Sequence, residues 1–227
     1  MKKIIRFLVC MVLCAVFTLS LPLGALADEA PQDSGAKLMA ITFDDGPGDY
    51  TLDLLDALAQ RGVKATFFIT GSRVSAYPGV LDAIAAGGHQ LANHTHNHKN
   101  LNTLTAEQVS KEVNATRDLL VAAGGEQTYY VRAPYGNANN TVKSAVDAPL
   151  IYWSVDPEDW KYRNADTVYN NIVKNAYDGC IILCHDVYKT TVNGALRAID
   201  TLQSQGYEFV TVEQLLNGHA VVLIHNG

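Results

Sequence analysis

Short apolar runs alternate with amphipathic segments along almost the whole chain after residue 37, and this alternation limits the fold more than any other feature. The apolar runs are rich in Val, Ile, Phe and Tyr and are bounded by Gly, Pro, Asn or Asp, as is typical of buried strands. We expect strands at residues 38–43, 65–69, 90–92, 129–131, 150–153, 180–183 and 208–210.

The segments between these runs predict helices. The clearest covers residues 105–123, where Thr105 and Gln108 form a capping box and Val109 and Val113 lie on one face. Others are expected at residues 51–60, 74–86, 139–146, 165–176 and 192–204. Strict alternation of strand and helix favours an α/β fold with a mainly parallel sheet, open or closed into a barrel. In such folds the chemistry gathers where the strands end.

The first 27 residues differ from the rest of the chain. Three basic residues precede an apolar run over residues 7–21, and Ala25-Leu26-Ala27 has the pattern of a signal-peptidase site. An uncleaved membrane anchor is the alternative, but Pro22 lies where a spanning helix would have to continue. We therefore expect a signal peptide and a secreted or cell-wall-associated protein.

The domain organisation and charge follow from the same boundary. Residues 28–36 are predicted to be a polar linker, and residues 37–227 to be one domain. Without residues 1–27, 14 Lys and Arg remain against 23 Asp and Glu, a formal charge of −9. This balance argues against nucleic acid as a partner, because phosphate binding needs a basic face. A neutral substrate is expected instead.

Two cysteines, Cys180 and Cys184, remain outside the signal segment, and both lie in one apolar run. In a strand their Cα atoms would be about 13 Å apart, at ~3.3 Å per residue. A disulfide requires less than ~7 Å, so we expect two unpaired, buried thiols.

Two adjacent carboxylates, Asp44 and Asp45, follow the first predicted strand. In a continuing strand they would point in opposite directions, so that one could bind a metal ion while the other accepts a proton. A simple turn is the alternative, because Asp and Gly are common turn residues.

Three histidines within five residues, His94, His96 and His98, follow the third predicted strand. On one helical turn His94 and His98 would face the same way and could chelate one divalent ion, whereas His96 would point elsewhere. Together with one carboxylate they form a set that is used for catalytic zinc and for non-haem iron.

Further polar residues follow the later strands. Arg132 comes after the fourth, where a fixed arginine could hold a catalytic carboxylate ionised and lower its pKa. Asp156 and Asp159 follow the fifth, and His185 leaves the sixth beside Asp186. Such a histidine could be a general acid with a carboxylate raising its pKa. Taken singly, each could equally be a capping or salt-bridging residue.

In order, the motifs Thr-Phe-Asp-Asp-Gly, His-Thr-x-x-His, Arg-x-Pro-Tyr, Asp-x-x-Asp-Trp and Leu-x-His resemble those of the polysaccharide deacetylase family, carbohydrate esterase family four. The resemblance extends from residue 37 to about residue 216, and no motif is broken. Cys184, where an apolar residue is more usual, and His96 are minor departures. The resemblance implies a distorted, incomplete (β/α) barrel with its site at the C-terminal ends of the strands.

The resemblance also implies a role for each matching residue. The ligands of a divalent metal ion, expected to be zinc with cobalt, nickel or manganese as alternatives, would be Asp45, His94 and His98. The catalytic set would be Asp44 as general base, His185 as general acid, Arg132 holding Asp44, Asp159 tuning His185, and the Tyr135 backbone N–H at the oxyanion. The substrate-binding residues would be Tyr135, Trp160 and Leu183, of which Trp160 and Leu183 would line the pocket for the acetyl methyl group. Asp156 matches a motif position without a separate role.

The activity implied is hydrolytic removal of N-acetyl groups from N-acetylglucosamine-type residues of a polysaccharide, such as peptidoglycan or a chitin-like polymer, with release of acetate. Three alternatives remain: an O-acetyl esterase acting on xylan, a non-catalytic carbohydrate-binding protein, and a non-haem iron oxygenase. The intact pair of proton-transfer residues argues against the second, and the lack of a His-x-Asp or His-x-Glu pair argues against the third. We expect a monomer whose partner is the polysaccharide, with no nucleic acid and no membrane association after signal cleavage.

Overall fold

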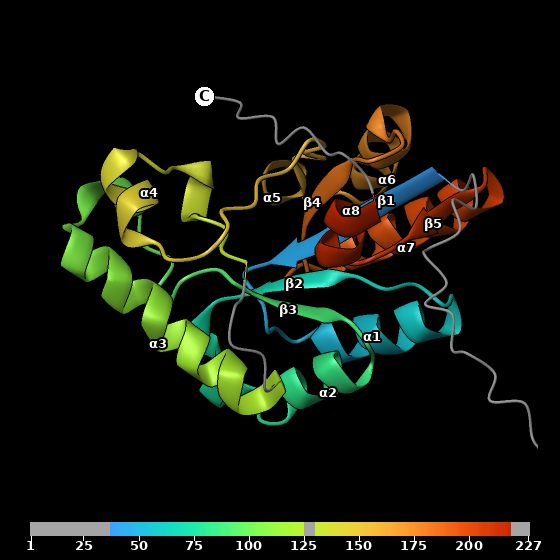
Figure 1. Ribbon diagram of the computed structural model, residues 1–227. Coiled ribbons are helices and arrows are strands. Elements are labelled where there is room, and N and C mark those ends of the chain that lie inside the picture. The colour runs from blue at the N-terminus through green and yellow to red at the C-terminus, as the bar shows by residue number, and fades with distance from the viewer. Residues whose placement is uncertain (1–36, 125–129, 219–227) are drawn as a thin grey trace, which may run out of the picture. The chain divides into compact units, whose positions relative to one another are not determined.

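The computed structural model describes residues 37–124 and 130–218, where five strands form a parallel sheet (Figure 1). The strands are β1 (Lys37–Asp44), β2 (Thr66–Ile69), β3 (Gln90–Asn93), β4 (Ile181–His185) and β5 (Tyr207–Phe209). Their order is β3-β2-β1-β4, and β5 pairs with the beginning of β1. The predicted signal peptide and linker lie outside the described residues.

Isolated bridges extend the sheet at both edges. Val131 pairs in parallel with the end of β3 and with Leu150, and Val155 pairs in parallel with β4. The sheet therefore curves towards a barrel that regular strand pairing does not close. This is the distorted, incomplete (β/α) barrel that the sequence predicts.

The strands expected at residues 129–131 and 150–153 are wrong in the described part of the chain, where only single bridges form. The cause is the side chain of Arg132, which occupies carbonyl groups that a regular ladder would use. Its Nε donates to the Ile151 carbonyl at 3.2 Å, and its Nη2 donates to the Tyr152 carbonyl at 3.0 Å.

Alternate residues of the strands face two different cores, because side chains on a strand alternate between its faces. The outward rows pack in the larger core and include Met39, Ile41, Phe43, Phe67, Ile69 and Ile182. The inward rows pack in a smaller core that contains Ala40, Phe68, Ala92 and Ile181. Continuing the inward rows of β1 and β4 by the same period of two leads to Asp44 and His185 at the strand ends.

The described α-helices are α1 (Thr51–Gln60), α2 (Val80–Ala86), α3 (Ala106–Gly124), α4 (Asn140–Ala145), α5 (Asp159–Tyr162), α6 (Ala165–Asn175), α7 (Lys189–Ser204) and α8 (Val212–Gly218). Short 3-10 helices are η1 (Gly71–Ala76), η2 (Leu101–Thr103) and η3 (Pro134–Gly136). The predicted capping box at the start of α3 is confirmed, since Thr105 and Gln108 exchange two hydrogen bonds. The helices α5 and α8 were not predicted.

The single helix expected at residues 74–86 is wrong. The chain forms η1 and then α2, with Pro78 and Gly79 between them. Proline disfavours helical geometry in the residue before it, and Gly79 has a left-handed φ of 79°, which only glycine adopts readily.

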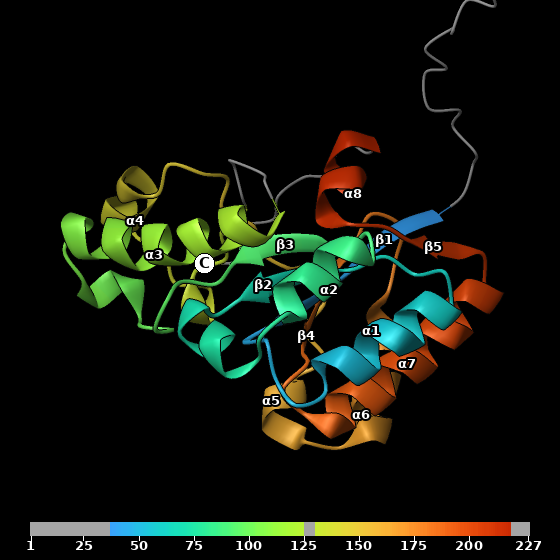
Figure 2. The ribbon, with the colours of Figure 1, turned by 90° about the horizontal axis from the view of Figure 1, so that it is seen from below.

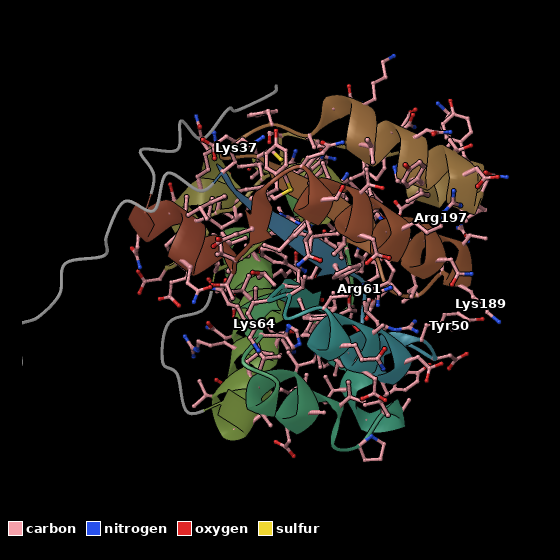
Figure 3. The ribbon with its side chains drawn as sticks, turned by 90° about the vertical axis from the view of Figure 1, so that its right-hand side faces the viewer. Lys37, Tyr50, Arg61, Lys64, Lys189 and Arg197 are labelled. Atoms are coloured by element: carbon pink, nitrogen blue, oxygen red, sulfur yellow. The ribbon has the colours of Figure 1, made fainter. Side chains whose placement is uncertain are left out.

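The helices follow one another around the sheet in the order α3, α2, α1, α7, α6 (Figure 2). Ion pairs join neighbours on this outer face, where Arg61 contacts Asp200 and Arg197 contacts Asp166 (Figure 3). Such exposed pairs contribute about 0–1 kcal/mol each. No helix in residues 37–124 and 130–218 is long and apolar enough to cross a membrane.

The N-terminal ends of the strands are covered by α8, whose Val212 and Leu215 pack against Ala40 and Ile181. In the part of the chain that the structure describes, the C-terminal ends carry polar side chains instead. Cys180 and Cys184 are buried and unpaired, as predicted, and burial raises the pKa of both thiols. They are therefore core residues without reactive character.

Candidate active site

A cavity of about 490 Å³ lies at the C-terminal ends of the strands. Asp44 from β1 and Leu183 and His185 from β4 line it. The loops that follow the strands contribute the other lining residues: Asp45, His94, His98, Ala133, Tyr135, Trp153, Asp156 and Trp160. Two further residues of the predicted site, Arg132 and Asp159, are fully buried and contact Asp44 and His185. The structure thus brings together the residues to which the motifs assign metal-binding, catalytic or substrate-binding roles.

The two carboxylates at the end of β1 reach the same cavity instead of pointing apart. The expectation for a continuing strand is wrong because the strand ends at Asp44 and Asp45 adopts a left-handed φ of 69°. Asp tolerates this conformation better than most residues. Beyond the turn, the buried Asp186 accepts a hydrogen bond from the Thr51 hydroxyl, which itself accepts one from the Gly48 N–H.

Residues 94–98 form an irregular loop, so the assumption of a helical turn is wrong. Thr95 and His98 have left-handed φ values of 66° and 53°, which bend the chain differently from a helix. The rings of His94 and His98 nevertheless meet, with centroids 4.9 Å apart. His96 lies outside this cavity, as expected, and lines a different one.

The ligand atoms of Asp45, His94 and His98 lie within 4.8 Å of one another. Asp45 Oδ1 is 3.5 Å from His94 Nε2 and 3.2 Å from His98 Nε2, yet this buried oxygen accepts no hydrogen bond from any residue that the structure describes. His94 Nδ1 lies 2.8 Å from the Arg132 carbonyl, which can only accept. The ring proton is therefore at Nδ1, and the Nε2 lone pair faces Asp45.

Burial also lowers the pKa of His94 to about 3, so its imidazole is neutral. A neutral imidazole lone pair and a carboxylate oxygen that face each other without a proton between them suit a cation. Two histidines and one carboxylate match the donor set of three-ligand catalytic metal sites. The residues present thus fit a divalent ion.

Asp44 is held from behind by Arg132. Arg132 Nη1 donates to Asp44 Oδ1 and to the Thr42 hydroxyl, both at 2.7 Å, and its guanidinium lies 4.0 Å from the Phe68 ring centroid. Burial raises the pKa of Asp44, and the positive charge of Arg132 opposes that rise. Arg132 thus lowers the pKa as the sequence predicts, but burial outweighs it, so the net direction is upward. Asp44 Oδ2 lies 3.8 Å from His94 Nε2, towards the ligand cluster.

His185 is paired with Asp159. Asp159 Oδ1 receives His185 Nδ1 at 2.8 Å and the Trp160 N–H at 2.9 Å, while Oδ2 receives the His185 N–H and the Thr191 hydroxyl at 2.8 Å. Burial alone would lower the pKa of His185, but the hydrogen bond and charge of Asp159 outweigh it and raise the pKa to about 9. Asp186, its neighbour in the sequence, bonds to Thr51 instead.

Aromatic side chains form the rim of the cavity. Tyr135 is 63% exposed and has a left-handed φ of 62°, and its ring meets that of His98 edge-on at 4.9 Å. Trp160 is 50% exposed, whereas Leu183 is buried in the wall. Asp156 also lines the cavity, and its Oδ1 accepts the Glu158 N–H at 2.7 Å.

Sequence reasoning missed the supports of this site. Thr42 binds Arg132, Thr191 binds Asp159, and Trp153 lines the cavity. Thr42 begins the first motif but has no role assigned to it there, and Thr191 lies outside every motif. Trp153 lay in a segment that was interpreted as a strand, where an aromatic residue needs no functional explanation.

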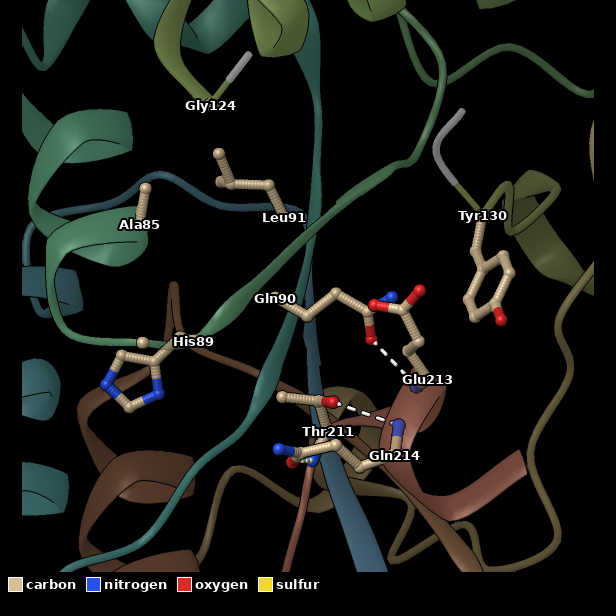
Figure 4. A pocket seen from close by; sticks show the side chains of 10 residues that line it. Ala85, His89, Gln90, Leu91, Gly124, Tyr130, Thr211, Glu213 and Gln214 are labelled. Atoms are coloured by element: carbon tan, nitrogen blue, oxygen red, sulfur yellow. Dashed lines mark hydrogen bonds between the residues drawn. The ribbon is translucent and has the colours of Figure 1, made fainter. Parts of the chain in front are cut away.

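A second cavity, of about 320 Å³, lies between the start of β3 and α8 (Figure 4). Several of its polar groups make hydrogen bonds within the fold. Gln90 Oε1 accepts from the Glu213 N–H at 3.1 Å and from the Thr66 hydroxyl at 2.9 Å, and the Thr211 hydroxyl accepts from the Gln214 N–H at 3.2 Å. Among the described residues, the one cluster suited to a metal ion is that of Asp45, His94 and His98.

The chain is similar to known proteins. The sequence model of the family described as polysaccharide deacetylase matches residues 32–152. The chain belongs to the polysaccharide deacetylase family. The peptidoglycan-N-acetylglucosamine deacetylase PgdA of Listeria monocytogenes is 39% identical over 196 residues, which are 86% of this chain and 42% of that protein. The peptidoglycan-N-acetylmuramic acid deacetylase PdaC of Bacillus subtilis is 39% identical over 192 residues, 84% of this chain and 41% of that protein.

The solved structure of Bacillus subtilis PdaC has the same fold within this family. It superposes with a TM-score of 0.78 at 39% identity and covers 81% of this chain and 91% of that chain. The chain thus spans about two fifths of the length of the two curated relatives but most of the solved domain.

Proposed function

We propose that this protein is a metal-dependent N-deacetylase that acts on N-acetylglucosamine-type residues of peptidoglycan or a similar polysaccharide. One observation carries the proposal: a three-residue ligand cluster lies in one cavity between a carboxylate held by an arginine and an imidazole held by a carboxylate. The names of the two relatives, both peptidoglycan deacetylases, support the substrate class.

Asp45, His94 and His98 would hold the metal ion. When bound there, a divalent ion, which we expect to be zinc, would polarise the acetyl carbonyl and lower the pKa of a water molecule.

Asp44 would be the general base. Arg132 and Thr42 occupy the side of Asp44 Oδ1, so Oδ2 is the oxygen that faces the ligand cluster. This oxygen takes a proton from the attacking water as the new carbon–oxygen bond forms. Arg132 is a positioning residue here, since its guanidinium fixes the carboxylate and favours its charged form.

His185 would be the general acid. Asp159 occupies Nδ1, which leaves Nε2 for the substrate. The raised pKa keeps a proton on this ring at neutral pH. That proton passes to the nitrogen of the leaving amine as the carbon–nitrogen bond breaks, and acetate and a free amino sugar are the products.

The wall residues would place the acetyl group between base and acid. The Tyr135 backbone N–H would bind the developing oxyanion. Trp160 and Leu183 would contact the acetyl methyl group, and the exposed rings of Tyr135 and Trp160 offer flat apolar surface to a sugar. The protein would act outside the cytoplasm as a monomer, with the polysaccharide as its partner.

The test is acetate release by metal-stripped protein, with and without added zinc, on N-acetylglucosamine oligomers, peptidoglycan and acetylated xylan. We expect zinc to restore release from an N-acetylated substrate. Asp44→Asn should lower it by about 10²–10⁴. The matched control is Asp56→Asn, a change at an exposed carboxylate of α1, which should retain it.

The other outcomes separate the alternatives. Release from xylan alone would reassign the protein as an O-acetyl esterase, and one structural relative is a domain of a multidomain xylanase. Sugar binding without release from any substrate would indicate a carbohydrate-binding protein. Release that needs no metal would contradict the role of the ligand cluster.

A further inference from the structure

A buried carboxylate outside the cavity contacts the loop that carries two of the proposed metal ligands. Glu112 lies on α3 and is 6% exposed, and it is the charged member of the helix's buried residues. A buried carboxylate is unfavourable unless hydrogen-bond donors surround it. The donors of Glu112 all come from the loop after β3.

Each oxygen of Glu112 is used. Oε2 accepts the backbone N–H of Asn97 at 2.7 Å, and Oε1 accepts the Asn97 side-chain amide at 2.9 Å. The ammonium group of Lys99 lies 2.9 Å from Oε1. Asn97 and Lys99 flank His98 directly, so the carboxylate holds the chain on both sides of that residue.

The first half of the same loop has separate anchors. The Asn93 side chain accepts the Thr95 N–H at 2.8 Å, and the carbonyls of Thr95 and His96 accept N–H groups from η1 at 3.0 and 2.9 Å. These contacts fix the chain as far as His96. The described contacts of the second half centre on Glu112.

The second half of the loop needs support because His98 has a left-handed φ of 53°. Residues other than glycine keep such a conformation where neighbouring contacts enforce it. The conformation aims the His98 ring at Asp45, with Nε2 3.2 Å from Oδ1. A relaxed backbone at His98 would move the ring away from this oxygen.

We propose that Glu112 is a positioning residue, which acts through Asn97 and Lys99 to hold His98 as a metal ligand. This inference rests on the proposed function, because it concerns the same metal site. A carboxylate is required, since both oxygens accept from N–H groups. A glutamine would turn an NH₂ group towards one of these donors and lose that bond.

The experiment compares Glu112→Gln with Glu107→Gln, an exposed glutamate in the first turn of the same helix. Zinc affinity is measured by competition with a chelator, and ligand geometry by the visible spectrum of the cobalt-substituted protein. We expect Glu112→Gln to weaken zinc binding about tenfold and to alter the cobalt spectrum, as is usual when an outer support of a ligand is lost. Glu107→Gln should match the unaltered protein.

Asn97→Ala is the second variant, because it removes the side-chain bond and leaves the backbone bond to Glu112 intact. It should weaken zinc binding less than Glu112→Gln, and it keeps the test decisive if that variant fails to fold. Unchanged zinc affinity and an unchanged cobalt spectrum in the folded variants would overturn this inference alone. Absence of zinc binding by the unaltered protein would overturn the proposed metal site, and this inference with it.

Discussion

Two carboxylate–imidazole clusters face the same cavity, and they differ in their hydrogen-bond donors. Asp159 receives four donors, two of them from His185, and its partner ring carries a raised pKa of about 9. Asp45 Oδ1 lies between His94 and His98 and accepts no hydrogen bond from the described part of the chain. Similar residue types thus occupy opposite electrostatic situations.

This difference separates two functions of a carboxylate. A carboxylate that is fully supplied with donors can hold a proton on the neighbouring imidazole. A carboxylate that faces an imidazole lone pair has no positively charged partner there, and a bound metal ion would be such a partner. The number of hydrogen bonds that the carboxylate accepts therefore distinguishes the metal cluster from the acid cluster, although both consist of Asp and His.

The metal cluster should respond most strongly to loss of a ligand. His94→Ala removes the imidazole whose lone pair faces Asp45, so we expect zinc binding and turnover to be lost together. Calorimetric zinc titration and acetate release check this. His96→Asn is the matched control from the same loop, and it should retain zinc binding because His96 lies outside the cavity. Equal losses in both variants would show general damage to the loop.

Asp44→Asn should separate metal binding from chemistry. The amide keeps the size of the side chain but cannot accept the proton of water, so turnover should fall by about 10²–10⁴, the range for a lost general base. Zinc affinity should change little, because Asp44 lies outside the ligand set. Turnover near that of the unaltered protein would remove Asp44 from the role of base.

The acid cluster should respond through its pH dependence. His185 is protonated below its pKa of about 9, so kcat should fall as the pH rises through about 9. Asp159→Asn removes the charge that supports the proton, so this limb should move to lower pH. Thr191→Val removes one donor from Asp159 and should shift the limb less. A limb that stays in place in Asp159→Asn would contradict the pairing.

The smallest effect is expected at His89, a buried histidine away from both clusters. Burial, with the charge of Lys64, lowers its pKa to about 4 from an ordinary 6.5. The unfolded chain therefore binds more protons between these values, and stability falls as the pH drops from 6.5 towards 4. At pH 5 a shift of this size amounts to about 2 kcal/mol, or about 4–8 °C in Tm.

His89→Asn can keep the acceptor that His89 Nδ1 offers to the Ala65 N–H. The difference between the Tm values at pH 7 and pH 5, measured by thermal unfolding, should be smaller in this variant than in the unaltered protein. An identical difference in both proteins would show that His89 makes no contribution to the acid dependence of stability.

The sequence predicted the strand ends well, because period-two apolar rows and the motifs that follow them are local signals. It could not predict the left-handed backbone at Asp45 and His98. This backbone brings the two side chains together, which a regular strand or helix would not do. It also missed Glu112, since a glutamate on a helix is ordinarily a solvated residue. Its partner Asn97 lies 15 positions away in the sequence, and the two residues come into contact only when α3 packs on the loop.

The irregular structure of residues 150–153 could not be predicted from the sequence for a related reason. Residues 150–153 have the composition of a strand, but Arg132 takes the carbonyls of Ile151 and Tyr152. The local composition of a segment does not show that a side chain from elsewhere takes the backbone acceptors that a strand would use.

The most direct test compares Asp45→Asn with Asp159→Asn. Zinc binding to each metal-stripped variant is measured by calorimetry, and kcat is measured by acetate release. If the number of accepted hydrogen bonds separates the clusters, Asp45→Asn weakens zinc binding at least tenfold. Asp159→Asn should then leave zinc affinity within about twofold of the unaltered protein while its kcat falls. Equal loss of zinc affinity in the two variants would contradict the division between a metal cluster and an acid cluster.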